Sequence, residues 1–141
     1  MNKEFEQISL KPGFMKHNGG VLFKTIAENE YEFKATINTN HLNAAGITHG
    51  GFIAALVDAG AGTAAHRSAD QNQCVTISLE LKFISAVKLG QELIGKTKIQ
   101  KKTKSMIFLT CELKADSKIV ATASGVWKIL NKKLPGAGPE G

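Results

Sequence analysis

Residues 49–67 read HGGFIAALVDAGAGTAAHR, the one long run, free of proline, that lacks the alternation of a β-strand. This run is mostly apolar around the whole circumference of a helix, which is typical of a buried helix. We therefore expect a helix from Gly51 to His66. Because residues three and four apart are neighbours on a helix, the large side chains gather on one side: Phe52, Ile53, Leu56 and Val57.

A single acid lies in the middle of this helix. Asp58 falls on the side that is formed by the small residues Gly51, Ala54, Ala55, Ala61, Gly62 and Ala65. A stripe of small residues lets a sheet, a ligand or another chain approach closely. Because an unpaired buried carboxylate is costly, we expect Asp58 to bond to a neighbouring strand, to face solvent or to act in a functional site.

Length and composition are those of one globular domain. The chain has 141 residues, of which 43% are hydrophobic and 21% are charged. No apolar run is long enough to span a membrane, and the N-terminus has no apolar signal region. Cys74 and Cys111 are isolated, which is typical of free thiols in a cytosolic protein. We therefore expect a cytoplasmic protein without membrane contact. The four histidines form no HExxH motif, so neither a metal site nor a separate cofactor is expected.

The net charge of +6, from 18 Lys and Arg against 12 Asp and Glu, favours an anionic partner. Nucleic acid is not expected, because the chain has no RNP-like, helix-turn-helix or zinc-finger pattern. A phosphorylated small molecule has the required charge. A solvated basic surface would explain the same excess.

Strands are expected on both sides of the helix. Residues 1–18 are expected to hold one or two short helices, followed by a hairpin of residues 21–27 and 31–37. After the helix, Val75, Ile77, Leu79, Leu81 and Phe83 alternate with Thr76, Ser78, Glu80 and Lys82, the clearest strand signal in the chain. Further strands are expected at residues 92–100, 105–115 and 119–130.

This order of elements predicts an α+β domain. Short connections imply antiparallel pairing, and only the helix is long and apolar enough to cover a face of the sheet. We expect a single domain over residues 1–130, with its core at about 20–130. The glycines and prolines of residues 131–141 predict a disordered tail.

The segment that leads into the helix carries a motif. It consists of Asn43, Gly46, His49-Gly50-Gly51, Leu56, Asp58 and Gly62. This motif resembles the pattern HNxxGxxHGGxxxxLxDxxxG of the hotdog-fold thioesterases, in the branch that acts in phenylacetic acid degradation (PaaI-like). One departure is that Leu42 separates His41 from Asn43. The resemblance covers about residues 20–130. It implies a curved antiparallel sheet of about five to six strands wrapped around one long central helix, activity on acyl-CoA thioesters, and subunits that join their sheets edge to edge.

Thioester hydrolysis needs a nucleophile or base and a donor for the developing oxyanion. Amides at a helix N-terminus are unpaired and carry partial positive charge, and Gly50 and Gly51 leave theirs accessible, although these glycines would also serve a tight turn. Asp58 would attack the carbonyl or activate a water molecule. On one helix, however, Gly50 and Asp58 are about 12 Å apart. Since the carbonyl must lie close to both groups, we expect the site between antiparallel helices of two subunits.

The resemblance implies further site residues. Asn43 matches a residue that orients the water or the thioester, or it caps its own loop. Thr76 matches a Ser or Thr that binds the attacking water, or it is an ordinary strand residue. We expect His49 to lock the loop rather than to polarise the substrate. The phosphates of coenzyme A would bind basic residues, for which the candidates are Lys82, Lys101, Lys102 and Lys104; each of these would otherwise be a solvated surface residue.

The leading hypothesis is an acyl-CoA thioesterase, acting on an acyl or aryl-acyl group as a dimer or a dimer of dimers. A hotdog hydratase would pair a His with an acid at a different spacing, and no such pair is present. A non-catalytic module that binds or senses acyl-CoA is the alternative, although pure binding would require neither Asp58 nor Asn43.

Overall fold

One long helix lies among strands in the order that the sequence predicts. The computed structural model describes residues 4–131. Its elements are β1 (Glu6–Gln7), α1 (Phe14–His17), β2 (Leu22–Ala27), β3 (Glu30–Thr36), the 3-10 helix η1 (Thr39–His41), α2 (Gly50–Ser68), β4 (Cys74–Phe83), β5 (Glu92–Lys102), β6 (Met106–Ala115) and β7 (Lys118–Ile129). The predicted tail, from residue 132 onward, lies outside the described residues. Within residues 4–131, no helix combines the length and the hydropathy that a membrane span requires.

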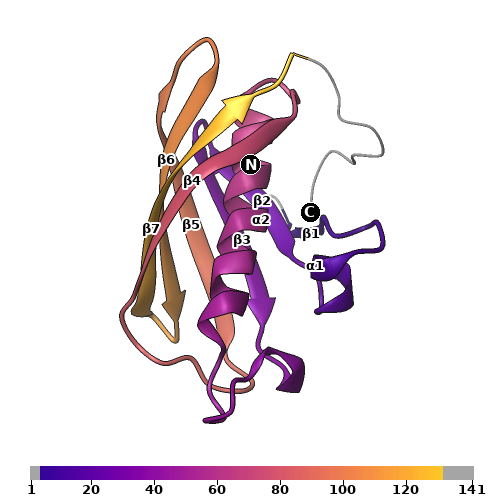
Figure 1. Cartoon of the computed structure of the whole chain (residues 1–141), viewed down its shortest axis with the longest axis vertical. Helices are drawn as coiled ribbons and strands as arrows, with labels where there is room; N and C mark the ends of the chain where they lie inside the picture. The colour runs from indigo at the N-terminus through magenta and orange to yellow at the C-terminus, as the bar shows by residue number, and fades with distance from the viewer. Residues whose placement is uncertain (1–3, 132–141) are drawn as a thin grey trace.

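The strands that the structure describes form one antiparallel sheet, which curves around α2 (Figure 1). Their order is β1-β2-β3-β5-β6-β7-β4. This arrangement confirms the predicted antiparallel sheet around one long helix. The sheet has seven strands because Glu6 and Gln7 pair with Phe23 and Leu22, in a region where the sequence suggested only short helices.

The core lies between α2 and the face of the sheet that it covers. Leu56 and Val57 of α2 and Phe33 of β3 are completely buried there. Two glycines allow α2 and β5 to pack closely against the ring of Phe33. A Cβ at Gly60 would lie 2.3 Å from this ring, and a Cβ at Gly95 would lie 2.2 Å from it. The ring therefore fills the space between helix and sheet, and any larger residue at either glycine would force repacking.

A β-bulge in β4 changes which of its side chains face α2. Thr76 pairs with Trp127 of β7, whereas Ser78 pairs with Val126, so Ile77 is an extra residue without a partner in the ladder. A bulge interrupts the alternation of side chains along a strand. Thr76 therefore faces the helix, although the sequence pattern groups it with the outward-facing polar residues.

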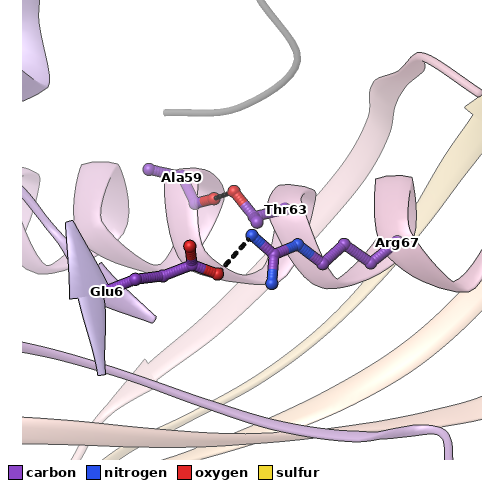
Figure 2. Close-up of polar contacts among 4 residues, drawn as sticks. All are labelled: Glu6, Ala59, Thr63 and Arg67. Atoms are coloured by element: carbon purple, nitrogen blue, oxygen red, sulfur yellow. Dashed lines mark hydrogen bonds and ion pairs between the residues drawn. The ribbon is translucent and has the colours of Figure 1, made fainter. Parts of the chain in front are cut away.

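An ion pair connects the N-terminal strand to α2. Glu6 of β1 lies 2.7 Å from the guanidinium of Arg67, in the last turn of α2 (Figure 2). Two residues nearby on the helix are also linked, since the hydroxyl of Thr63 donates to the carbonyl of Ala59 over 2.8 Å. β1 thus covers part of one edge of the sheet. At the other edge β4 has no neighbouring strand beyond β7 among residues 4–131.

Candidate active site

Asp58 and Thr76 meet at the surface of the molecule. The hydroxyl of Thr76 donates a hydrogen bond to Oδ1 of Asp58 over 2.6 Å, and both residues are exposed. The bulge at Ile77 makes this contact possible, because in a regular strand Thr76 would point away from α2. Since a carboxylate has two acceptor oxygens, Oδ2 is left for a water molecule or a substrate.

The N-terminus of α2 presents one open amide. His49 is the N-cap, and its Nδ1 accepts a hydrogen bond from the N–H of Gly51 over 2.8 Å. Because Nδ1 is the acceptor, a neutral His49 carries its proton on Nε2. Among residues 4–131 the N–H of Gly50 has no acceptor. Of the two glycine amides that the sequence offers for an oxyanion, that of Gly50 is the one left open.

Asn43 stabilises the loop before α2. Its Oδ1 accepts hydrogen bonds from the N–H of Ala45 over 2.9 Å and from the N–H of Ile47 over 3.3 Å. The side chain thus caps its own loop, which is one of the two interpretations that the sequence leaves open. Its amide NH₂ group is still available to donate to an outside partner.

His41 fixes the same loop from within the core. It is 2% exposed, its Nδ1 accepts from the N–H of Asn38 over 3.0 Å, and its Nε2 lies 2.6 Å from the carbonyl oxygen of Asn18. Its ring stacks on Phe52 of α2, with 3.6 Å between the centroids. Its carbonyl accepts from the N–H of His49 over 2.8 Å. These contacts of His41 hold the loop before α2 and the N-cap residue His49 in place.

The structure keeps Gly50 and Asp58 apart within one chain. Both lie on the unbroken helix α2, and their separation along its axis is about 12 Å. Phe83 of β4 lies beside the first of them, since a Cβ at Gly50 would be 3.4 Å from its ring. A carbonyl oxygen bound to the N–H of Gly50 cannot also reach Asp58 of the same chain. Within one chain these two groups therefore cannot act together on one carbonyl.

Lys102 is engaged at the other end of α2. An extra residue in β5, Gln100, turns it toward the helix, and its Nζ donates to the carbonyl of Ser68 over 2.8 Å. A cation at this position satisfies a free carbonyl and complements the helix dipole. Ser68 is about 15 Å from Asp58 along the helix axis, so this lysine stabilises the helix C-terminus.

The other three candidate lysines are exposed. Lys101 and Lys104 belong to the β5–β6 hairpin, the first at the end of β5 and the second in the turn. Lys82 lies 3.6 Å from Glu80 on β4, and both side chains are more than two-thirds exposed. An ion pair of this kind contributes little to stability.

Burial suppresses the ionisation of both cysteines. It raises the pKa of the Cys111 thiol from 9.0 to about 12, and it raises the pKa of the half-buried Cys74 thiol. Both cysteines are free. Since the thiolate is the reactive form, neither environment favours a cysteine nucleophile. Within residues 4–131, no three His, Cys, Asp or Glu side chains are grouped so that they could hold a metal ion.

Two aromatic residues beside the site were missed by the sequence analysis. Phe83 borders Gly50, and Trp127 lies opposite Thr76, with its indole nitrogen 3.3 Å from the position of a Cβ at Gly62. The only sequence signal was the glycine itself. The aromatic residue that lies beside a glycine is determined by which strands pair. The alternation in the sequence predicted the strands but not their order in the sheet.

The fold and the site geometry define the class of protein. An antiparallel sheet around one long helix, with an acid in the middle of the helix and an open amide at its N-terminus, is expected of a hotdog-fold thioesterase. The family model of the Thioesterase superfamily matches residues 45–122, more than half of the chain. The chain belongs to this family.

Individual relatives agree with this assignment. The chain is 34% identical over 94 residues, 66% of its length and 70% of the relative's, to a Pseudomonas aeruginosa protein named "Putative esterase PA0474". Its fold is similar to that of zebrafish thioesterase superfamily member 2, with a TM-score of 0.78 and 22% identity over 86% of this chain and 90% of that one. It is also similar to the E. coli PaaI protein of the phenylacetic acid degradation operon, with a TM-score of 0.75 and 19% identity over 82% and 83% of the two chains. These structures confirm the hotdog fold.

Proposed function

We propose that this protein is an acyl-CoA thioesterase, which hydrolyses its substrate to a free acid and coenzyme A. The observation that carries the proposal is the hydrogen bond between Thr76 and Asp58, because it orients one carboxylate oxygen and leaves the other free. Membership of the Thioesterase superfamily supports the reaction class. The excess of basic residues suits a substrate that carries phosphates.

In the proposed reaction, the carbonyl oxygen of the thioester binds the N–H of Gly50. This amide, at the positive end of α2, stabilises the oxyanion that forms when the carbonyl carbon is attacked. Asp58 either removes a proton from the attacking water or attacks the carbon itself, and Thr76 holds its carboxylate in place. When Asp58 acts as the base, it passes the proton of the water to sulfur as the bond between carbon and sulfur breaks, so that the free acid and the thiol of coenzyme A leave. When Asp58 attacks the carbon itself, the same bond breaks and coenzyme A leaves as a thiolate that takes a proton from water. A water molecule then hydrolyses the anhydride between the acyl group and Asp58, which releases the free acid and restores the carboxylate.

Two subunits would build each site, with Gly50 from one and Asp58 from the other. The outer edge of β4, which pairs with no strand in the part of the chain that the structure describes, supports this arrangement, since an open strand edge is a template for pairing with another chain. Along this strand Ile77 is 54% exposed and Phe83 is 57% exposed. A second copy that continues the sheet at β4 would cover these apolar side chains, in a dimer or in a dimer of dimers.

Release of coenzyme A from a panel of short-chain, long-chain and aromatic acyl-CoA esters tests the activity. The wild type is compared with Asp58→Asn, which keeps the shape of the side chain and removes its charge. We expect turnover of at least one ester, and a loss of about a hundredfold or more in the variant. Blanks without ester correct for the protein's own thiols, Cys74 and Cys111.

The same assay separates the proposal from a non-catalytic binding module. Tight binding of coenzyme A or its esters without turnover, in a folded wild-type protein, would favour binding or sensing instead. Full activity of Asp58→Asn would refute the role of Asp58 and leave the reaction class standing.

A further inference from the structure

The face of the sheet that is turned away from α2 has a hollow of about 490 Å³, which we call the lysine hollow. It extends over three adjacent strands, β5, β6 and β7 (Figure 1). The side chains of this face that line it are Lys96, Lys98, Thr110, Glu112, Lys114 and Thr122. They alternate along the strands with residues such as Thr97 and Leu113, which are completely buried on the side of α2. The lysine hollow therefore lies on the opposite face of the sheet from the Asp58–Thr76 pair.

Positive charge predominates in the lysine hollow. Three ammonium groups line it against one carboxylate, that of Glu112. Lys114 lies 3.7 Å from Glu112, and Lys96 lies 3.9 Å from Glu30 of β3. Since both pairs are partly exposed, they hold the ammonium groups only weakly. Lys98 forms no ion pair with another residue of 4–131, and the acids of β3 lie beyond β5, outside the hollow. This lining favours an anion with more than one negative charge.

A second hollow, of about 350 Å³, adjoins the first, since Thr110 lines both. It contains Phe108, which is 38% exposed on a mostly polar face. The acid of this second hollow, Glu80, lies 3.6 Å from Lys82. An exposed aromatic ring is a platform on which another flat ring stacks, and every nucleic acid base has such a face.

The groups of the two hollows follow one another along β6. Four side chains that point to this face are two residues apart: Lys114, Glu112, Thr110 and Phe108. Consecutive ones are therefore about 7 Å apart, and they present a cation, a carboxylate, a hydroxyl and an aromatic ring. A nucleotide presents phosphate, ribose hydroxyls and a base in the same order, and a carboxylate is a common acceptor for ribose hydroxyls. On β5, Lys96 is opposite Glu112, so a second ammonium group lies toward the phosphate end.

We propose that this face of the sheet binds a nucleoside diphosphate, with its phosphates in the lysine hollow, its ribose hydroxyls at Glu112 and its base on Phe108. The site goes beyond the proposed thioesterase activity and does not depend on it, because the Asp58–Thr76 pair lies on the other face. Stacking on a phenyl ring tolerates any base, so the class of ligand is assigned and the base is not. The nucleotide end of coenzyme A has the same chemistry as a free nucleotide, and the test distinguishes the two.

Calorimetric titrations of the full chain with ADP, with coenzyme A and with inorganic phosphate test this site. Lys98→Glu should weaken ADP binding about tenfold or more, because a charge-assisted hydrogen bond is lost and a repulsive charge is added. Phe108→Ser should weaken ADP binding about fivefold or more and leave phosphate binding unchanged, because only ADP has a base to stack. The matched controls, Lys11→Glu and Phe14→Ser, change exposed residues before and in α1, on the α2 side of the sheet. Both should bind ADP as the wild type does.

Lys98 and Phe108 are exposed, and circular dichroism checks that each variant is folded. Absence of ADP binding to the folded wild type at millimolar concentration would refute the site, as would equal ADP affinity of the wild type and both variants. ADP binding that is no tighter than phosphate binding and is unaffected by Phe108→Ser would contradict a nucleotide.

The coenzyme A titration identifies the source of the nucleotide. An equal loss of ADP and coenzyme A binding in Lys98→Glu would assign the site to the nucleotide end of coenzyme A. A loss for ADP alone would assign it to a free nucleotide. Neither result bears on thioester hydrolysis, which is measured separately with the acyl-CoA esters.

Discussion

At the scale of single residues, the site depends on how the side chains around Asp58 are held. Its carboxylate is exposed and accepts a hydrogen bond from Thr76 over 2.6 Å. Asp58 lies at the surface and not in a buried pocket. In the proposed reaction, its position and the groups that a second subunit would bring account for its reactivity. Among residues 4–131, Thr76 is the one side chain that forms a hydrogen bond with it.

Thr76→Val should lower kcat about tenfold and leave the fold intact. The substitution keeps the shape of the side chain and removes a hydrogen bond to a charged group, whose contribution is at the low end of the usual range because both residues are exposed. Steady-state kinetics on the best ester would measure the effect. Thr76→Ser, which restores the hydroxyl, should recover most of the activity. Equal kcat for Thr76→Val and the wild type would show that the hydrogen bond is incidental.

The buried thiol of Cys111 should make stability depend on alkaline pH. Its pKa is raised to about 12 by burial, whereas an unfolded cysteine titrates near 9.0. Above pH 9 the unfolded state therefore loses a proton that the folded state keeps, and the free energy of unfolding falls by about 1.4 kcal/mol for each pH unit. Below pH 9 this residue contributes no pH dependence.

Urea unfolding at pH 8 and pH 10.5 measures this decline. Cys111→Val removes the titrating group and should show a shallower decline between the two values than the wild type. Identical slopes for the two proteins would mean that other groups, such as the lysines, account for the whole alkaline loss.

At the scale of elements, α2 begins with an unusual cap. Ser, Thr, Asp and Asn are the preferred N-cap residues, yet the N-cap of α2 is His49. Its Nδ1 accepts a hydrogen bond from the N–H of Gly51. A Cβ at Gly51 would lie 2.9 Å from this nitrogen. The lack of a side chain at Gly51 is therefore needed for the cap by His49, whether or not a substrate also approaches this residue.

His49→Ala should destabilise the protein by about 1 kcal/mol, because the N–H of Gly51 loses its acceptor. His49→Asn supplies another side-chain acceptor and should retain most of the stability. Chemical denaturation of the three proteins at neutral pH tests this prediction. Equal stability of the Ala and Asn variants would indicate that water replaces the cap.

The elements themselves were largely predictable, and the bulges were not. The helix was predicted from a long, mostly apolar run without strand alternation, and the strands of the hairpin were predicted from their alternation, which is strong where one face is buried. The bulge at Ile77 breaks that period, and the unbroken pattern assigns Thr76 to the wrong face of β4. Thr76 was named as a candidate site residue only because it matches a position in the family, and nothing in the sequence pattern placed it near Asp58. Only the register with β7 shows how it reaches the helix.

At the scale of the whole molecule, the two halves of the proposed site lie on one helix and cannot act on one carbonyl within one chain. Gly50 and Asp58 are about 12 Å apart along α2, and no strand of residues 4–131 pairs with the outer edge of β4 beside Thr76. The sequence alone yielded this argument, since it requires only helix geometry. It did not reveal the engagement of Lys102 with Ser68, which depends on a second bulge.

The most direct test of the shared site is to mix two inactive variants. Gly50→Pro removes one N–H and little else: proline is favoured at the first residue of a helix, and His49, with φ −64° and ψ 131°, already has the conformation that a residue before proline adopts. Gly50→Ala, which keeps the N–H, is its matched control and should remain active. The partner variant is Asp58→Asn. Each of Gly50→Pro and Asp58→Asn should be inactive alone.

When the two variants are unfolded together and refolded as mixed dimers, each mixed dimer contains one site with an intact Gly50 and an intact Asp58. The account predicts that hydrolysis returns to about a quarter of the wild-type rate, because half of the dimers are mixed and each has one working site. No recovery of hydrolysis, with mixed dimers shown to be present, would contradict a site that is shared between subunits.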